Sequence, residues 1–132
     1  MSSENTQKIR DGLTALKGGD IAAALKEFDR FAVLRFDPKW PENRPRVGVE
    51  EIHSYFEDLV ATFGTGNGVI EEVIEAADRV LVRVRYRFEA QGSGVQDEVV
   101  VTQLFTFRRG KVIEFEYFLD FDDALQAIGL SE

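Results

Sequence analysis

The stretch FTFRRGKVIEFEYFLDFDDALQAIGL, residues 105–130, decides the class of fold. Within it, Glu114 and Glu116 alternate with Phe115 and Tyr117. A period of two is typical of a strand, here charged on one side and aromatic on the other. A short Arg-Gly connection precedes this strand, so we expect it to pair antiparallel with the strand before it.

The strand pattern extends upstream from this stretch. β-branched and aromatic residues alternate with polar ones, and the connections between segments are short, which predicts a meander of antiparallel strands. The expected strands are 69–76, 78–90, 97–109 and 111–119. The closing FDDALQAIGL predicts a brief helix that ends at Gly129.

Helical periodicity dominates the first half of the chain. Apolar residues recur three and four positions apart in 9–16, 21–31 and 52–63. We expect Asp20 to cap the second helix by accepting a hydrogen bond from a free backbone N–H, and Gly64 to end the third.

Between the second and third helices, AVLRF (32–36) is expected to be a short strand that ends at Asp37-Pro38. A loop with two prolines follows over 40–47. Helices followed by a meander predict a single α+β domain over 1–132, with three N-terminal helices packed on one side of a curved antiparallel sheet and a short C-terminal helix.

Strand alternation predicts which side of the sheet faces the helices. In segment 79–87 arginines occupy one side of the strand. Removing an unpaired arginine from water would cost on the order of several kcal/mol. The aromatic sides should therefore face inward. The inward residues then include Tyr86, Gln103 and Tyr117, and in the last strand also Ile113, with Val112 outward.

The outer side of the sheet mixes apolar residues with charges of both signs. Such a surface suits a subunit contact, so we expect a homodimer through this side of the sheet. The alternative is a solvated sheet crossed by ion pairs, each worth about 0.2–1 kcal/mol.

Composition excludes several classes of partner. A net charge of −8 disfavours nucleic acid and anionic membrane surfaces. The polar N-terminus does not resemble a signal peptide, and no apolar run approaches the ~20 residues needed to span a bilayer. With no cysteine and only one histidine, His53, we expect no metal site, no cofactor and a cytoplasmic location.

Three motifs carry a resemblance to a known family: GGD at 18–20, the hairpin from Phe105 to Val112, and the ending FLDFDDALQAIGL. Over about residues 6–130 the chain resembles the SnoaL-like branch of the nuclear transport factor 2-like superfamily. That resemblance implies a cone-shaped sheet with helices around an apolar cavity, usually in a dimer. The superfamily includes polyketide cyclases, ketosteroid isomerases, epoxide hydrolases and non-catalytic binders, so fold alone does not fix the chemistry.

The resemblance also suggests catalytic positions. The cyclases' inward acid/base Asp and His correspond to Tyr117 and Gln103, neither of which shuttles protons readily near neutral pH. The isomerases' base, an Asp before Pro, corresponds to Asp37, whereas their oxyanion-binding Tyr corresponds to Gly12. If catalysis exists, Asp37 is the expected base, with Gln103 and Tyr117 donating to a developing enolate. Asp-Pro also ends strands for purely conformational reasons, and Asp37 taken by itself fits a turn former better than a general base.

The expected function is therefore binding of a hydrophobic small molecule. If the protein is catalytic, we expect cofactor-independent isomerisation or cyclisation of a ring substrate. The residues expected to line the cavity are Phe36, Trp40, Tyr55, Tyr86, Phe105 and Phe115. The alternative is a non-catalytic binding or dimerisation module whose interior is filled by phenylalanine rings.

Overall fold

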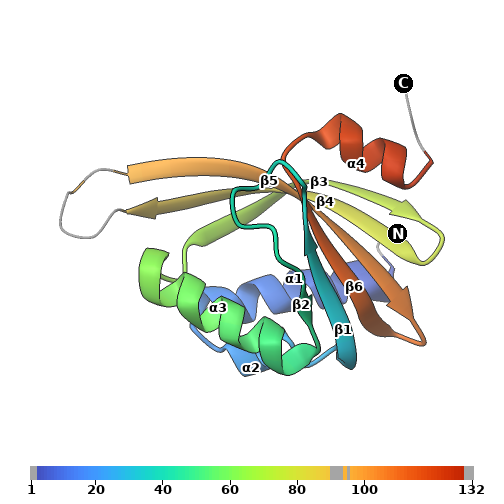
Figure 1. The fold of residues 1–132 in the computed structure, drawn as a ribbon, viewed down its shortest axis with the longest axis horizontal. Coiled ribbons are helices and arrows are strands. Elements are labelled where there is room, and N and C mark those ends of the chain that lie inside the picture. The colour runs from blue at the N-terminus through green and yellow to red at the C-terminus, as the bar shows by residue number, and fades with distance from the viewer. Residues whose placement is uncertain (1–2, 90–93, 95, 130–132) are drawn as a thin grey trace.

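The computed structural model describes residues 3–89, 94 and 96–129. A curved six-stranded sheet is flanked by helices (Figure 1). The helices are α1 (Glu4–Lys17), α2 (Ile21–Ala24), α3 (Val49–Phe63) and α4 (Phe121–Ala127). The strands are β1 (Phe28–Phe36), β2 (Arg46–Val47), β3 (Asn67–Ala76), β4 (Arg79–Glu89), β5 (Gln96–Arg108) and β6 (Lys111–Phe118). The α+β prediction is confirmed.

The order of strands across the sheet is β2-β1-β6-β5-β4-β3. The meander from β3 to β6 is antiparallel, as expected from its short connections. The expectation of a wholly antiparallel sheet is wrong at one place, because β1 pairs parallel with β6. The direction of that pairing depends on the path of the chain through α3 and the meander, which connect β1 to β6. The periodicity of residues along β1 does not encode this path.

The second helix is shorter than the sequence predicts. It ends at Ala24, and β1 already begins at Phe28. Asp20 caps it as expected, accepting a hydrogen bond of 3.0 Å from the Ala23 amide. Residues 28–31 join the strand instead because Phe28 pairs with Val112 of β6 and packs edge-on against the Phe115 ring. Burial in the sheet outweighs the helical pattern there.

The third helix matches its prediction. It continues to Phe63 and ends at Gly64, whose φ of 80° suits a glycine. His53 lies off its buried side, with Nδ1 3.4 Å from a carboxylate oxygen of Glu57, as expected for a solvated helix histidine.

A bulge changes the alternation at the start of β6. Thr106 pairs with Glu114, but Phe107 pairs with Val112, so one residue of β6 has no counterpart. Val112 therefore faces inward, where only 2% of it is exposed, and its predicted outward position is wrong. Ile113 is the extra residue and is half-buried. A β-bulge of one residue reverses the side on which preceding residues lie.

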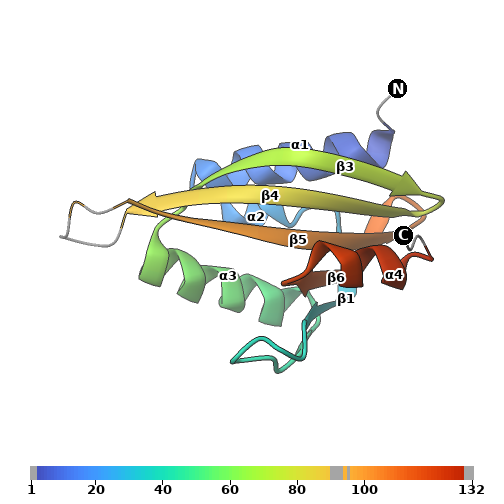
Figure 2. The same cartoon turned by 90° about the horizontal axis from the view of Figure 1, so that it is seen from above.

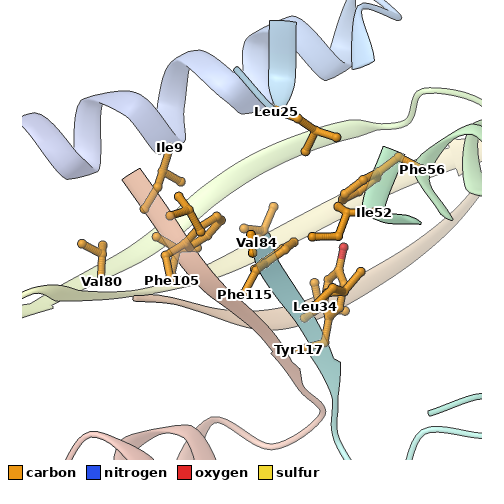
Figure 3. Packing of buried hydrophobic residues seen from close by; sticks show 14 of the residues in the cluster. Ile9, Leu25, Leu34, Ile52, Phe56, Val80, Val84, Phe105, Phe115 and Tyr117 are labelled. Carbon is orange, nitrogen blue, oxygen red and sulfur yellow. The ribbon is translucent and has the colours of Figure 1, made fainter. Parts of the chain in front are cut away.

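Two apolar clusters lie on opposite sides of the sheet. The main core lies between the sheet and α1–α3, and Figure 3 shows Ile9, Phe56, Phe105 and Tyr117 meeting in it. The smaller cluster centres on Leu81, Leu104 and Ala124, because α4 packs on the outer side (Figures 1 and 2). Helices thus cover both sides of the sheet, not one as expected.

Candidate functional site

Two pockets open in the interior between the sheet and the helices. The first has a volume of about 230 Å³ and lies between α1, α2 and the inner side of the sheet. The second, about 270 Å³, lies beside α3 and includes Trp40 in its wall. Four residues line both pockets: Leu16, Phe56, Tyr86 and Tyr117. The pockets therefore adjoin along this shared boundary.

The two pockets differ in polarity. Charged side chains at the first are Lys8, Asp11, Lys26 and Glu27, all from the α1–α2 layer and its junction with β1. Lys8 is held in place there by the Gly110 carbonyl oxygen at 2.7 Å and the Glu27 carboxylate at 3.6 Å. Among the described residues, no charged side chain lines the second pocket.

Phenol groups lie at the boundary. The Gln103 side-chain amide donates a hydrogen bond of 2.9 Å to the Tyr86 hydroxyl oxygen. Burial raises the pKa of Tyr86 to about 12, even though that hydrogen bond opposes the rise. Burial also raises the pKa of Tyr117 well above its usual value, with further contributions from Tyr86 and Tyr55. Both phenols are therefore neutral, proton-bearing donors near pH 7.

Tyr117 is fixed by aromatic neighbours. Its ring stacks on Phe36 with centroids 5.6 Å apart and planes 16° apart, and it contacts Trp40 at 5.5 Å and Phe115 at 4.9 Å. Figure 3 shows its hydroxyl oxygen pointing away from the sheet, toward Ile52 and Phe56. Within the part of the chain that the structure describes, this hydroxyl has no hydrogen-bond partner. A phenol in this state, in the wall of both pockets, is an available donor.

Asp37 has a different environment. It is 4% exposed and lines neither pocket. One carboxylate oxygen accepts from the Lys39 amide at 2.9 Å and the other from the Leu119 amide at 3.1 Å. Burial by itself would raise the pKa of Asp37, but these two amides and the Lys39 charge together lower it. The carboxylate thus ties the end of β1 to the end of β6.

The structure places seven of the nine predicted site residues at the pockets. Gln103, Phe105 and Phe115 line the first, Trp40 and Tyr55 the second, and Tyr86 and Tyr117 both. Phe36 lies behind them, stacked on Tyr117, and Asp37 lies outside. Sequence reasoning did not select Leu16 or Phe56, although each belongs to an apolar helical stripe that could have indicated it.

Ion pairs cross the outer side of the sheet, as the alternative of a solvated sheet predicts. Arg85 contacts Glu71 at 2.7 Å and also Glu98, and Arg87 contacts Glu98 at 3.0 Å. Closer to β1, burial and the neighbouring Glu114 carboxyl raise the pKa of Glu116 to about 7, although Arg79 and Arg35 oppose the rise. Glu116 is therefore partly protonated at neutral pH.

Replacing Glu116 with Gln should stabilise the protein at pH 8 by on the order of 1–2 kcal/mol and have little effect at pH 4.5. Because its pKa rises from 4.5 to about 7 on folding, the folded state binds more protons, and stability falls as the pH rises through that window. Guanidinium unfolding at both pH values measures the difference. Glu42→Gln, in the exposed loop before β2, is the control; an equal gain in both variants would contradict the assignment.

No group of three or more His, Asp or Glu side chains within residues 3–89, 94 and 96–129 is arranged to hold a metal ion. In the same residues, no helix combines the length and apolar character needed to cross a membrane.

Comparisons with known proteins agree with this architecture. Bal32a from a soil-derived mobile gene cassette is 24% identical, with a TM-score of 0.74 over 86% of this chain and 87% of its own. A protein of Jannaschia sp. CCS1, provisionally assigned as a SnoaL-like polyketide cyclase, is 23% identical with a TM-score of 0.77 over 100% and 99%. TerC, co-crystallised with polyporic acid, is 19% identical with a TM-score of 0.77 over 96% and 98%.

These structures share the fold at identities too low to carry function. A comparison with curated proteins found no match. The SnoaL-like domain model, however, matches residues 9–115, which include most of α1, all of α2, α3 and β1 to β5, and most of β6. The chain therefore belongs to the SnoaL-like domain family.

Proposed function

We propose that the protein binds a small, mostly apolar molecule that carries a carbonyl or hydroxyl oxygen, in the interior between the sheet and α1–α3. The observation that carries this proposal is the Tyr117 hydroxyl, a donor without a hydrogen bond among the described residues, on a side chain that lines both pockets. A ligand oxygen that accepts from it would gain a hydrogen bond worth about 0.5–1.5 kcal/mol.

The polar groups at the boundary suit binding better than proton transfer. Gln103 does not titrate, and the raised pKa values of Tyr86 and Tyr117 make both phenols poor proton acceptors near pH 7. Asp37, the expected base, has both carboxylate oxygens occupied by backbone amides. We therefore assign Asp37 a structural role, while Tyr117 and Gln103 orient the ligand.

Two structurally similar proteins support a small organic ligand. TerC was co-crystallised with polyporic acid, and the protein of Jannaschia sp. CCS1 is provisionally assigned as a SnoaL-like polyketide cyclase. In this proposal the present chain binds such a molecule and needs no cofactor to do so. Isomerisation or cyclisation would require a proton acceptor other than the two phenols.

Tyr117→Phe should weaken the binding of acetophenone about 2–10-fold, since it removes one hydrogen bond and leaves the aromatic packing intact. Isothermal titration with acetophenone and with ethylbenzene, which lacks the oxygen, separates the hydrogen bond from apolar contact. Only acetophenone should be affected.

Asp37→Asn is the matched control for this test. It should leave acetophenone binding unchanged but lower the free energy of unfolding at pH 7 by about 1–3 kcal/mol, because a charged acceptor of two amides is lost. If Asp37→Asn abolished binding in a folded protein, or if wild type bound ethylbenzene as tightly as acetophenone, the proposal would fail.

We also propose that two chains associate through the part of the outer side that α4 leaves uncovered. Val69 and Val100 are 53% and 38% exposed there, and they flank the Arg85 ion pairs. Sedimentation equilibrium should give twice the chain mass of 14.9 kDa. Val100→Glu should return the mass to that of one chain; a monomeric wild type contradicts the association.

A further inference from the structure

Both pockets are small for a ligand site when each is taken by itself. Ligand pockets usually begin at about 300 Å³, and an apolar cavity of about 150 Å³ is enough to hold benzene. At about 230 and 270 Å³, each pocket is larger than a cavity that holds benzene and smaller than a usual ligand pocket. Each therefore has room for one ring, and only the two together reach the usual size of a ligand site.

The boundary between the pockets has a different composition from their far ends. Apolar side chains form most of the far walls, with Ile9 and Val112 in the first pocket and Leu59 and Val60 in the second. The first pocket also has the four charged side chains of the α1–α2 layer and its junction with β1 in its wall. The hydroxyls of Tyr86 and Tyr117 come from the residues that line both pockets. Among the described residues, the phenol donors thus lie at the boundary, and the charges lie at the α1–α2 end of the first pocket.

We infer that the two pockets form one site for a molecule with two apolar lobes joined through a central oxygen-bearing carbon, such as a diaryl ketone. One lobe lies under α1 and α2, and the other lies beside α3 and Trp40. The central oxygen accepts a hydrogen bond from Tyr117. This inference rests on the proposed function and adds the shape of the ligand to it.

The boundary itself can adapt to such a ligand. Leu16 and Phe56 belong to α1 and α3, two helices whose side chains meet there without a hydrogen bond between them in the described residues. We expect rotations of these two side chains to widen the boundary, whereas Tyr86 is held by Gln103. The polar groups therefore keep their positions when the lobes enter.

Titration with benzophenone, acetophenone and diphenylmethane tests the inference on the wild-type protein. Benzophenone should bind roughly 10–100-fold more tightly than acetophenone, because it buries a second ring. It should also bind more tightly than diphenylmethane, which has both rings but no oxygen. Equal affinities for benzophenone and acetophenone would mean that one pocket holds the whole ligand.

Variants that fill one pocket at a time supply the decisive comparison. Ala15→Phe fills the first pocket and Val60→Phe the second; the adjacent Thr14→Phe and Ala61→Phe point outside both and are the matched controls. Each filling variant should reduce benzophenone affinity to about that of acetophenone, and acetophenone should change less than about threefold, since its ring can use the other pocket. Sensitivity of benzophenone to only one filling variant overturns the inference.

Photolabelling provides a second measurement that needs no variant. Excited benzophenone abstracts a hydrogen from a nearby C–H group, and its carbonyl carbon then bonds to that side-chain carbon. The carbonyl should lie at the boundary, so peptide mapping should find the label on Leu16. A label confined to residues that line one pocket alone, such as Ile9 or Leu59, would overturn the inference while leaving the proposed function intact. Failure of every probe to bind would remove both.

Discussion

Gly68→Ala should abolish high-affinity binding of an aromatic ketone and lower the free energy of unfolding by about 1–3 kcal/mol. A Cβ at this position of β3 would lie 2.7 Å from Cε1 of Tyr86 and 3.1 Å from Cδ1 of Leu13. The first distance is shorter than real Cβ contacts, so the Tyr86 ring must move, and the second requires Leu13 to shift slightly. We expect the movement of the ring to break the hydrogen bond from Gln103 and to change the shape of the pockets that Tyr86 lines.

The control for this variant is Gly18→Ala. Gly18 has a φ of −82°, which alanine adopts freely, and the nearest atom to an added Cβ is the Ala15 carbonyl oxygen at 3.5 Å. Its stability and binding should remain near those of wild type. Calorimetry and acetophenone titration measure both properties, and a Gly68→Ala protein that binds normally would show that Tyr86 is not required where it lies.

Leu104→Ala should destabilise the protein by about 2–5 kcal/mol, the range for truncating a fully buried leucine. Leu104 is 0% exposed and packs with Leu81 and Ala124, so its side chain fills the contact between α4 and the outer side of the sheet. The cavity would weaken the attachment of α4. This helix is also held by a hydrogen bond of 2.8 Å from the Arg79 guanidinium to the Ala127 carbonyl oxygen, by the Lys39–Asp123 ion pair at 3.1 Å and by Arg83 over the Phe121 ring.

Val47→Ala is the comparison, because Val47 lies in β2, is 62% exposed and is outside the cluster. We expect a loss of less than about 1 kcal/mol for it. Guanidinium unfolding of the two variants measures the contrast. Similar losses would indicate that α4 contributes little to stability. Ligand binding at 25 °C should persist in both, since neither residue lines a pocket.

The alternation of side chains along the meander determined much of the site in advance. It placed Tyr86, Gln103 and Tyr117 in the interior because arginines on the opposite side of β4 could not be buried unpaired. It also predicted the third helix and its end at Gly64. These features depend on local periodicity and on the cost of burying charge, and both are properties of neighbouring residues in the chain.

Only the tertiary structure decided the features that depend on partners distant in sequence. Pairing with β6 turned residues 28–31 into strand, and the bulge at Val112 reversed its side. The docking of α4 buried Leu81 and Leu104 on the side that was expected to form a subunit contact. Asp37 became a link between strands rather than a pocket residue because the Leu119 amide, 82 positions away, lies beside it. Each of these outcomes is set by contacts between distant segments, whose energies a local pattern does not contain.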